Sequence, residues 1–183
     1  MTPDLIIDLF KYFSKFISKD VLKKMFIQPP KSRSSGYDEV SAEVLSFTNK
    51  HVLSEFDTFV VSVNENFVSE RMKNSKEYAL FVEYGSFSAD HTVTEGVKEN
   101  VAVSVVKNFS DSNRDNISEV IHYNKCLVLL EEIIRTMSDE QQEQEFCDGA
   151  LVDFPVEIFP IEPSMFYGCG GWCAKFKKIN TIL

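Results

Sequence analysis

Apolar and polar positions along the first 27 residues follow a helical period. Thr2 suits the N-cap and Pro3 the first helical position. Apolar residues then recur every three or four positions, at Ile6, Leu9, Phe10, Phe13, Ile17 and Val21. The opposite stripe is polar, so the pattern predicts one amphipathic, Phe-rich helix. Packing on its own domain is the simpler interpretation, and docking on a partner or a membrane surface is the alternative.

A short polar segment follows this helix. Residues 28–36, QPPKSRSSG, are rich in Pro, Ser and basic side chains, which is typical of a linker. Beyond it, apolar residues step by three, four and three, at Tyr37, Val40, Val44 and Phe47. They predict a second helix that ends near His51. We therefore divide the chain into an N-terminal helix, a linker and a single domain, at 1–27, 28–36 and 37–183.

The period changes to two in the middle of the chain. Apolar residues alternate in three segments, FVVSV (59–63), YALFVEY (78–84) and VAVSV (101–105). Alternation of this kind is typical of strands with one buried face. The segments 64–77 and 86–97 lack it and are typical of turns or long loops. Three strands in succession predict an antiparallel sheet with hairpin connections.

A long helix and two more strands complete the pattern. Steps of three and four predict a core helix of about twenty residues, through Val120, Tyr123, Leu127, Leu130, Ile134 and Met137. FPVEIFPIEP (154–163) alternates, but its three prolines confine it to a sheet edge. GWCAKFKKI (171–179) alternates as a final strand. The prediction is an α+β fold, an antiparallel sheet with a long core helix packed on one face and an N-terminal helical segment.

Composition and charge argue against some classes of function. The chain has 183 residues, 44% hydrophobic and 26% charged, as expected of one globular domain. Its net charge of −9 argues against a nucleic-acid surface, because phosphate contacts need clustered Lys and Arg. No run approaches the roughly 20 apolar residues of a membrane span, and no signal peptide is visible. We expect a soluble, cytoplasmic protein with reduced thiols.

The charge is distributed unevenly. Residues 1–27 carry five Lys and three Asp, a net of +2, so the remainder carries −11. Residues 136–174 hold eight acidic side chains and no Lys or Arg. An acidic body with a basic arm favours self-association or a protein partner.

The candidate chemistry centres on Cys169-Gly-Gly-Trp-Cys173. Redox dithiols usually need Cys-x-x-Cys at a helix N-terminus, whereas this spacing is one residue longer and leads into a strand. A zinc site needs four ligands, and no second pair stands at the required spacing. The two glycines suit a tight turn with positive φ. We interpret the motif as a structural turn, with a metal, a redox or a disulfide role as alternatives.

Other pairs of reactive residues are weaker candidates. His122 and Cys126 stand at i and i+4, but Cys126 lies on the apolar stripe and is expected to be an inert buried thiol. The carboxylate pairs Glu131–Glu132 and Asp139–Glu140 are adjacent in sequence, so their side chains do not face each other on a helix. We expect no catalytic residue, no metal and no cofactor, and a protein that is not an enzyme.

The order of the elements resembles that of the tail terminator and tail-completion proteins of long-tailed bacteriophages. Two segments carry the resemblance. ENVAVSVVKNFSDSNRDNISEVIHYNKCLVLLEEII (99–134) is a strand that passes through a polar loop into the core helix, and GWCAKFKKI is a closing strand in which an aromatic residue follows a glycine. The resemblance covers 57–179 in pattern, without a diagnostic motif. The linker, the helix after it and the long loops depart from the compact pattern of the family.

The resemblance implies a structural function. Members of the family form rings that bind the end of the tail tube, stop its polymerisation and face the head connector. It therefore implies a homo-oligomer such as a hexameric ring, with other tail or head-connector proteins as partners. The expected location is the host cytoplasm during assembly and then the virion. No cofactor, sequence-specific nucleic acid or membrane span is implied.

A closed ring needs a heterologous interface between neighbouring copies. We predict that Lys11 and Lys15 of the basic first helix meet an acidic neighbour around 139–162. Further docking candidates close the chain at a predicted sheet edge: Trp172, Lys175, Lys177 and Lys178. The alternative is that Trp172 belongs to the core and that the lysines protect the edge from aggregation.

Two other functions stay open. One is a small monomeric or dimeric protein-binding module that acts through a Phe-rich surface. The other is a thiol- or metal-dependent enzyme that uses Cys169 and Cys173.

Overall fold

The computed structural model describes residues 5–89, 97–109, 115–143 and 150–180; side chains at the strand ends 86–89, 97–99, 150–151 and 178–180 lie outside the description. In chain order the elements are α1 (Leu5–Ser14), α2 (Lys19–Met25), the 3-10 turn η1 (Pro30–Ser32), α3 (Tyr37–Ser46), β1 (Phe56–Val61), α4 (Glu65–Asn74), β2 (Tyr78–Ala89), β3 (Val97–Asn108), α5 (Asn116–Gln142), β4 (Ala150–Val152), β5 (Glu157–Ile161) and β6 (Cys169–Asn180).

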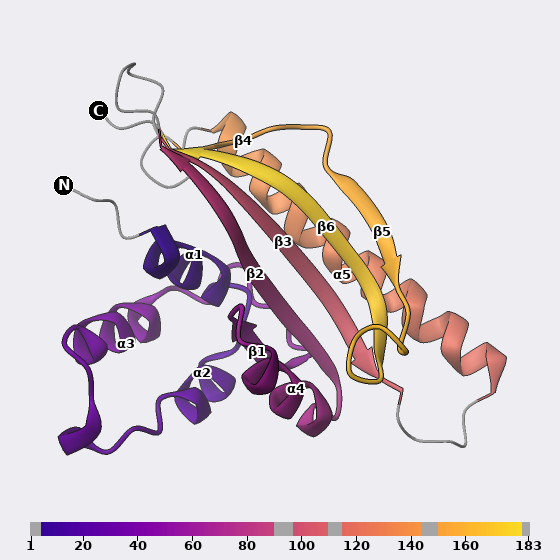
Figure 1. Ribbon diagram of the computed structural model, residues 1–183, viewed down its shortest axis with the longest axis horizontal. Coiled ribbons are helices and arrows are strands. Elements are labelled where there is room, and N and C mark those ends of the chain that lie inside the picture. The colour runs from indigo at the N-terminus through magenta and orange to yellow at the C-terminus, as the bar shows by residue number, and fades with distance from the viewer. Residues whose placement is uncertain (1–4, 90–96, 110–114, 144–149, 181–183) are drawn as a thin grey trace.

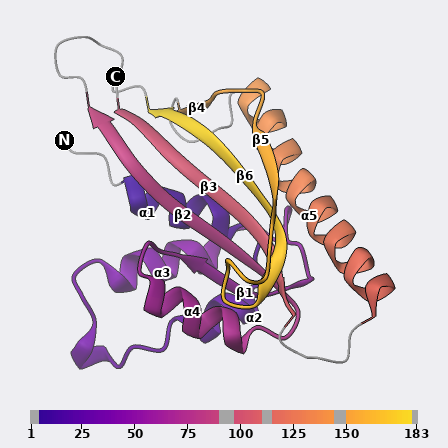
Figure 2. The same cartoon turned by 45° about the vertical axis from the view of Figure 1, so that its right-hand side comes forward.

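The fold is α+β, as predicted. Six strands form one sheet in the order β1-β2-β3-β6-β4, and β5 also pairs with β6. β2, β3 and β6 are antiparallel neighbours, and β6 lies inside the sheet although it follows all the other strands in the chain. The long helix α5 lies across β3 and β6 on one face, while the N-terminal helices gather near β1 (Figure 1 and Figure 2).

The first connection in the sheet differs from the prediction. β1 and β2 are parallel, so a crossover replaces the expected hairpin, and the segment predicted as a loop contains α4. Asn64 caps α4 by accepting from the amide of Phe67, and Val68 and Met72 are buried one turn apart. Asp57 of β1 accepts from the amides of Lys76 and Glu77, which fixes the end of the crossover to β1.

The N-terminal helix is divided into two. α1 ends at Ser14, and Ser18 starts α2 by accepting from the amide of Val21. The apolar residues of both helices and of the turn between them enter the core of the same chain, with exposed fractions of 0 to 2% at Leu9, Phe13, Phe16, Ile17 and Leu22. Packing on its own domain, the simpler interpretation, is therefore confirmed. α3 ends at Ser46, earlier than predicted, and the short strand β4 was not predicted.

The sheet buries its two faces unequally. Leu80, Val103, Val105 and Ala174 belong to a large core on the face that α5 and α1 cover. On the other face a small cluster surrounds α4, made of Val60, Val68, Met72, Ala79, Phe81, Val106 and Cys169. No helix among the described residues covers the rest of this second face, which contains the hollow described next (Figure 2).

A candidate interaction surface on the open face of the sheet

A hollow of about 730 Å³ lies on the uncovered face, between β2, β3, β6 and the segment that leads into β5. We call this surface the open sheet face. Its polar and small lining residues are Glu83, Gly85, Asn100, Ala102, Asp153, Glu157, Lys175 and Lys177.

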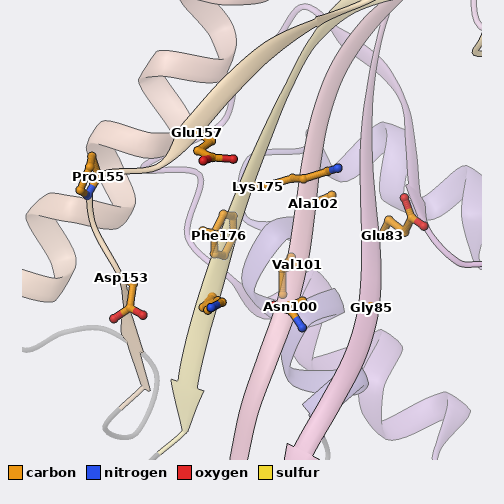
Figure 3. Close-up of a pocket in the computed structure, with 11 residues that line it drawn as sticks. Glu83, Gly85, Asn100, Val101, Ala102, Asp153, Pro155, Glu157, Lys175 and Phe176 are labelled. Carbon is orange, nitrogen blue, oxygen red and sulfur yellow. The ribbon is translucent and has the colours of Figure 1, made fainter.

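Strand register explains why the surface is hollow. Ala102 of β3 stands opposite Glu83 of β2 on one side and Lys175 of β6 on the other. Lys175 in turn stands opposite Glu157 of β5. The methyl group of Ala102 is much shorter than the side chains beside it on the neighbouring strands, so the surface is hollow at Ala102. Figure 3 shows Lys175 and Glu157 reaching across the face, with Ala102 beside Lys175.

The surface is also hollow two residues further along these strands, for a similar reason. Asn100 of β3 stands opposite Lys177 of β6. Gly85 of β2 lies so close to β3 that a Cβ atom there would be 2.9 Å from the carbonyl oxygen of Asn100. The amide of Asp153 donates to the carbonyl of Lys177 at 3.1 Å, which places the Asp153 carboxylate at the rim of the hollow.

The charges of the open sheet face are not neutralised by one another. Within the described ranges, no ion pair joins Lys175 or Lys177 to a carboxylate. The ammonium group of Lys175 instead lies 4.8 Å from the centre of the Phe159 ring. Two cations therefore lie among the carboxylates of Glu83, Glu157 and Asp153 without an ion-pair partner in the described part of the chain. An exposed arrangement of this kind is suited to charged groups from another molecule.

The predicted docking residues are separated by the sheet. Lys175 and Lys177 lie on the open sheet face, whereas Trp172 lies on the opposite face, under α5. The indole of Trp172 packs on the large core and its Nε1 donates to the carbonyl of Tyr123 at 3.0 Å. The core alternative for Trp172 thus matches the structure. The side chain of Lys178 lies outside the described residues.

The two lysines of the first helix have partners in the same chain. Lys11 forms an ion pair with Glu43 of α3 at 2.7 Å. Lys15 forms a partly buried ion pair with Glu140 of α5, whose carboxylate also accepts from the hydroxyl of Tyr12 at 2.8 Å. The predicted pairing of the basic helix with the acidic segment around 139–162 therefore occurs at Glu140, but within one chain.

The motif Cys169-Gly-Gly-Trp-Cys173 does not form the tight turn that the sequence predicts. The turn comes just before it, where Tyr167 and Gly168 have φ angles of 52° and 80°. Gly170 and Gly171 already belong to β6. They are small because of their neighbours: a Cβ atom on Gly170 would lie 2.3 Å from the hydroxyl oxygen of Tyr123, and one on Gly171 would lie 2.1 Å from the carbonyl oxygen of Val105.

The described thiols are free and buried. Burial raises the pKa of Cys126 to about 12 and that of Cys169 to about 11, and it also raises the pKa of Cys173. High pKa values keep these groups as neutral thiols, the form that is not nucleophilic. Among the residues that the structure describes, no three His, Cys, Asp or Glu side chains are grouped as a metal site would require.

This environment predicts slow thiol modification. In a variant with Cys147→Ser, which removes the one cysteine outside the described residues, a disulfide reagent at pH 8 should leave the native protein unmodified. Three thiols should react once denaturant unfolds it, because burial excludes the reagent and suppresses the thiolate. Absorbance of the released reagent gives the rate. If Cys173 of the native protein reacted with the reagent as fast as a free thiol does, that result would support the thiol-enzyme alternative.

The other candidate pairs have structural roles. Nδ1 of His122 lies 2.8 Å from the hydroxyl of Tyr78, so this imidazole connects α5 to the start of β2. Glu132 pairs with Arg135 on the exposed side of α5, and Glu140 pairs with Lys15. The sequence did not identify Glu83, Asn100, Asp153 or Glu157 as surface partners of the lysines. Alternation in YALFVEY places Glu83 on the same face of the strand as Ala79 and Phe81, and it does not indicate which residues of other strands lie beside Glu83.

Among the described residues, no helix combines the length and apolar character needed to cross a bilayer. A comparison of the chain with protein-family models, curated proteins and solved structures finds no match.

Proposed function

We propose that this chain is a non-enzymatic assembly protein that forms a closed ring through contacts between its own copies. The proposal follows the resemblance to tail terminator and tail-completion proteins. Its partners are then other tail or head-connector proteins, and it acts in the host cytoplasm during assembly and afterwards in the virion. The observation that carries the proposal is the open sheet face with its two lysines, which have no ion-pair partner among the residues that the structure describes.

A closed ring requires a surface of this kind on every copy. A heterologous interface joins two different surfaces, so each copy offers its open sheet face, where Lys175 and Lys177 lie among three carboxylates, to a surface of the next copy that has acidic groups opposite the two lysines. The chain has a net charge of −9, so acidic groups are available on such a surface. Complementary charges steer the encounter and fix its register, although they contribute less to the final affinity. The buried neutral thiols count against the alternative of a thiol enzyme.

The first experiment is light scattering on the purified chain after size exclusion, with zinc measured on the same peak. The expected result is a closed oligomer without zinc. A metal-free particle of one or two copies at all concentrations would contradict the ring and favour a binding module. A monomer that carries one zinc ion would favour the enzyme alternative.

Reversing the charge of the open sheet face should prevent ring formation. In the double variant Lys175→Glu and Lys177→Glu, the two cations become anions that repel the acidic surface of the neighbour, so the scattering mass should fall at least threefold. Both side chains are exposed, and far-ultraviolet circular dichroism should stay unchanged. The matched control is Lys23→Glu with Lys24→Glu, which alters the net charge equally on exposed positions of α2. Equal loss of mass in both variants would show that total charge, and not this face, controls assembly.

A further inference from the structure

The side of α5 that faces away from the sheet is apolar over its first half. Four large side chains on this side have exposed fractions between 48 and 70%: Ile117, Val120, Ile121 and Val128. Their spacing, together with Asn124 between them, places them on one helical stripe, opposite the buried Cys126 and Leu130. We call these five residues the α5 outer stripe.

The second half of the same side is polar. Glu131, Arg135, Asp139 and Gln142 continue the stripe and are all exposed. The boundary between the halves lies near the middle of α5, which spans Asn116–Gln142. An ordinary solvent-facing helix side carries polar residues along its whole length, so the apolar half indicates a surface that another molecule covers.

We propose that a second copy of this chain covers the α5 outer stripe, with the two α5 helices antiparallel about a two-fold axis near Asn124. In this arrangement Val120 and Ile121 of each copy lie level with Val128 of the other. The two Asn124 side chains meet at the axis, where each amide both donates and accepts, so each satisfies the other. A polar pair of this kind also fixes the register of packed helices.

The charges at the ends of the stripe fit the same register. Counting outward from Asn124, Arg135 of one copy comes within about one helical turn of Asp115, the N-cap of α5, in the other copy. The two-fold axis produces this opposite-charge contact twice. Glu131 comes level with the first turn of the other α5, where the helix dipole favours a carboxylate. Sequence distance from the axis thus places Val120 opposite Val128 and Arg135 near Asp115, while Ile117 comes level with Glu131.

The charges also argue against a membrane surface as the occupant. Helices that lie on membranes carry Lys and Arg beside their apolar stripe. Along α5 two basic side chains, Lys125 and Arg135, border the stripe, and Lys125 is held by an ion pair with Glu55. Exposed Glu119 and Glu131 would face anionic lipid. A protein surface, and specifically the same stripe on a second copy, is the better fit.

This pairing is independent of the proposed ring, because α5 and the open sheet face lie on opposite sides of the sheet. Two copies joined through α5 form an isologous pair, whereas the ring needs a heterologous contact. In the variant Lys175→Glu with Lys177→Glu the α5 pair should survive, with a mass of two copies, twice 20.9 kDa. Failure of one contact is therefore separable from failure of the other.

A lysine on the α5 outer stripe should separate the two copies that pair through α5. Ile121→Lys places two cations beside the axis, so the scattering mass should fall to half that of the unsubstituted chain, whether the particle is one pair or two stacked rings. Ile27→Lys is the control, because Ile27 is 67% exposed and far from α5 in the chain. Unchanged melting temperatures would show that both variants fold. The proposal is overturned if the unsubstituted chain is a single copy, or if Ile121→Lys leaves the mass unchanged.

Cross-linking tests the axis directly. In the Cys147→Ser background, Asn124→Cys should form a disulfide between copies under mild oxidation, seen as a doubled mass on a non-reducing gel. Gln142→Cys, on the same side of α5 but far from the axis, should form it at least tenfold more slowly. Equal rates at the two positions would refute the antiparallel register. If the chain bound to anionic vesicles and Ile121→Lys abolished that binding, the surface that covers the α5 outer stripe would be a membrane and not a second copy.

Discussion

Replacing Gly171 with alanine should destabilise the fold by about 3 kcal/mol, because the added methyl group has no space. Its carbon would lie 2.1 Å from the carbonyl oxygen of Val105 and 2.9 Å from the Cα of Val106. Both atoms belong to the backbone of β3, which pairs with β6 along its whole length and with β2 on its other side. The backbone of a strand held on both sides cannot move away without breaking hydrogen bonds.

Urea unfolding of the purified variant gives the change in the free energy of unfolding. Gly36→Ala is the matched control: its added carbon meets no atom within 4 Å, but the φ angle of +81° makes alanine unfavourable there. We expect that control to lose about 1 kcal/mol. Similar losses in the two variants would mean that the loss at Gly171 reflects backbone conformation and that β3 and β6 tolerate the methyl group.

A chain that lacks residues 1–27 should not fold. The deletion removes five large side chains that are at most 2% exposed, and each such truncation alone costs about 2–5 kcal/mol. Their sum, roughly 10–25 kcal/mol, is as large as or larger than the roughly 5–15 kcal/mol that stabilises a whole domain. Deletion also uncovers Val44, Phe56 and Phe59 in the same core, and it removes Lys15, the ion-pair partner of the largely buried Glu140.

The measurement is near-ultraviolet circular dichroism with thermal unfolding. The truncated chain should show no fixed aromatic signal and no cooperative transition. Phe16→Ala tests the same cause in the full-length chain and should lose about 3–5 kcal/mol, whereas Ile27→Ala, at a site 67% exposed, should lose less than about 0.5 kcal/mol. A truncated chain that melts cooperatively would show that α1 and α2 are a detachable arm.

The sequence predicts the elements whose periodicity is long and strong. α5 and the paired strands β2, β3 and β6 carry their apolar residues at regular spacing, because each buries one face along most of its length. α4 has two buried residues among ten, Val68 and Met72, and its mean character is polar. Periodicity is weak in such an element. The direction of β1 was not predictable either, since alternation reports which face is buried and not which way the neighbouring strand runs.

The candidate surface was predictable only along single strands. Alternation in β6 places Lys175 and Lys177 on one face and Trp172 on the other, so the prediction that all three form one docking surface conflicts with the two-sided sheet. Which side chains stand beside the lysines depends on register between strands far apart in sequence. Glu83 and Glu157 come within reach of Lys175 through that register alone. No local pattern carries this information.

The position of β6 has a consequence for the chain as it leaves the ribosome. Residues emerge in order, and β6 is made after β3, β4 and β5, the three strands that pair with it. Until β6 emerges, the nascent protein presents β3 as an open edge with unpaired backbone groups and an apolar face, the kind of surface that chaperones and neighbouring nascent chains bind. The sheet is completed in one late step, when β6 pairs with β3 on one side and with β4 and β5 on the other.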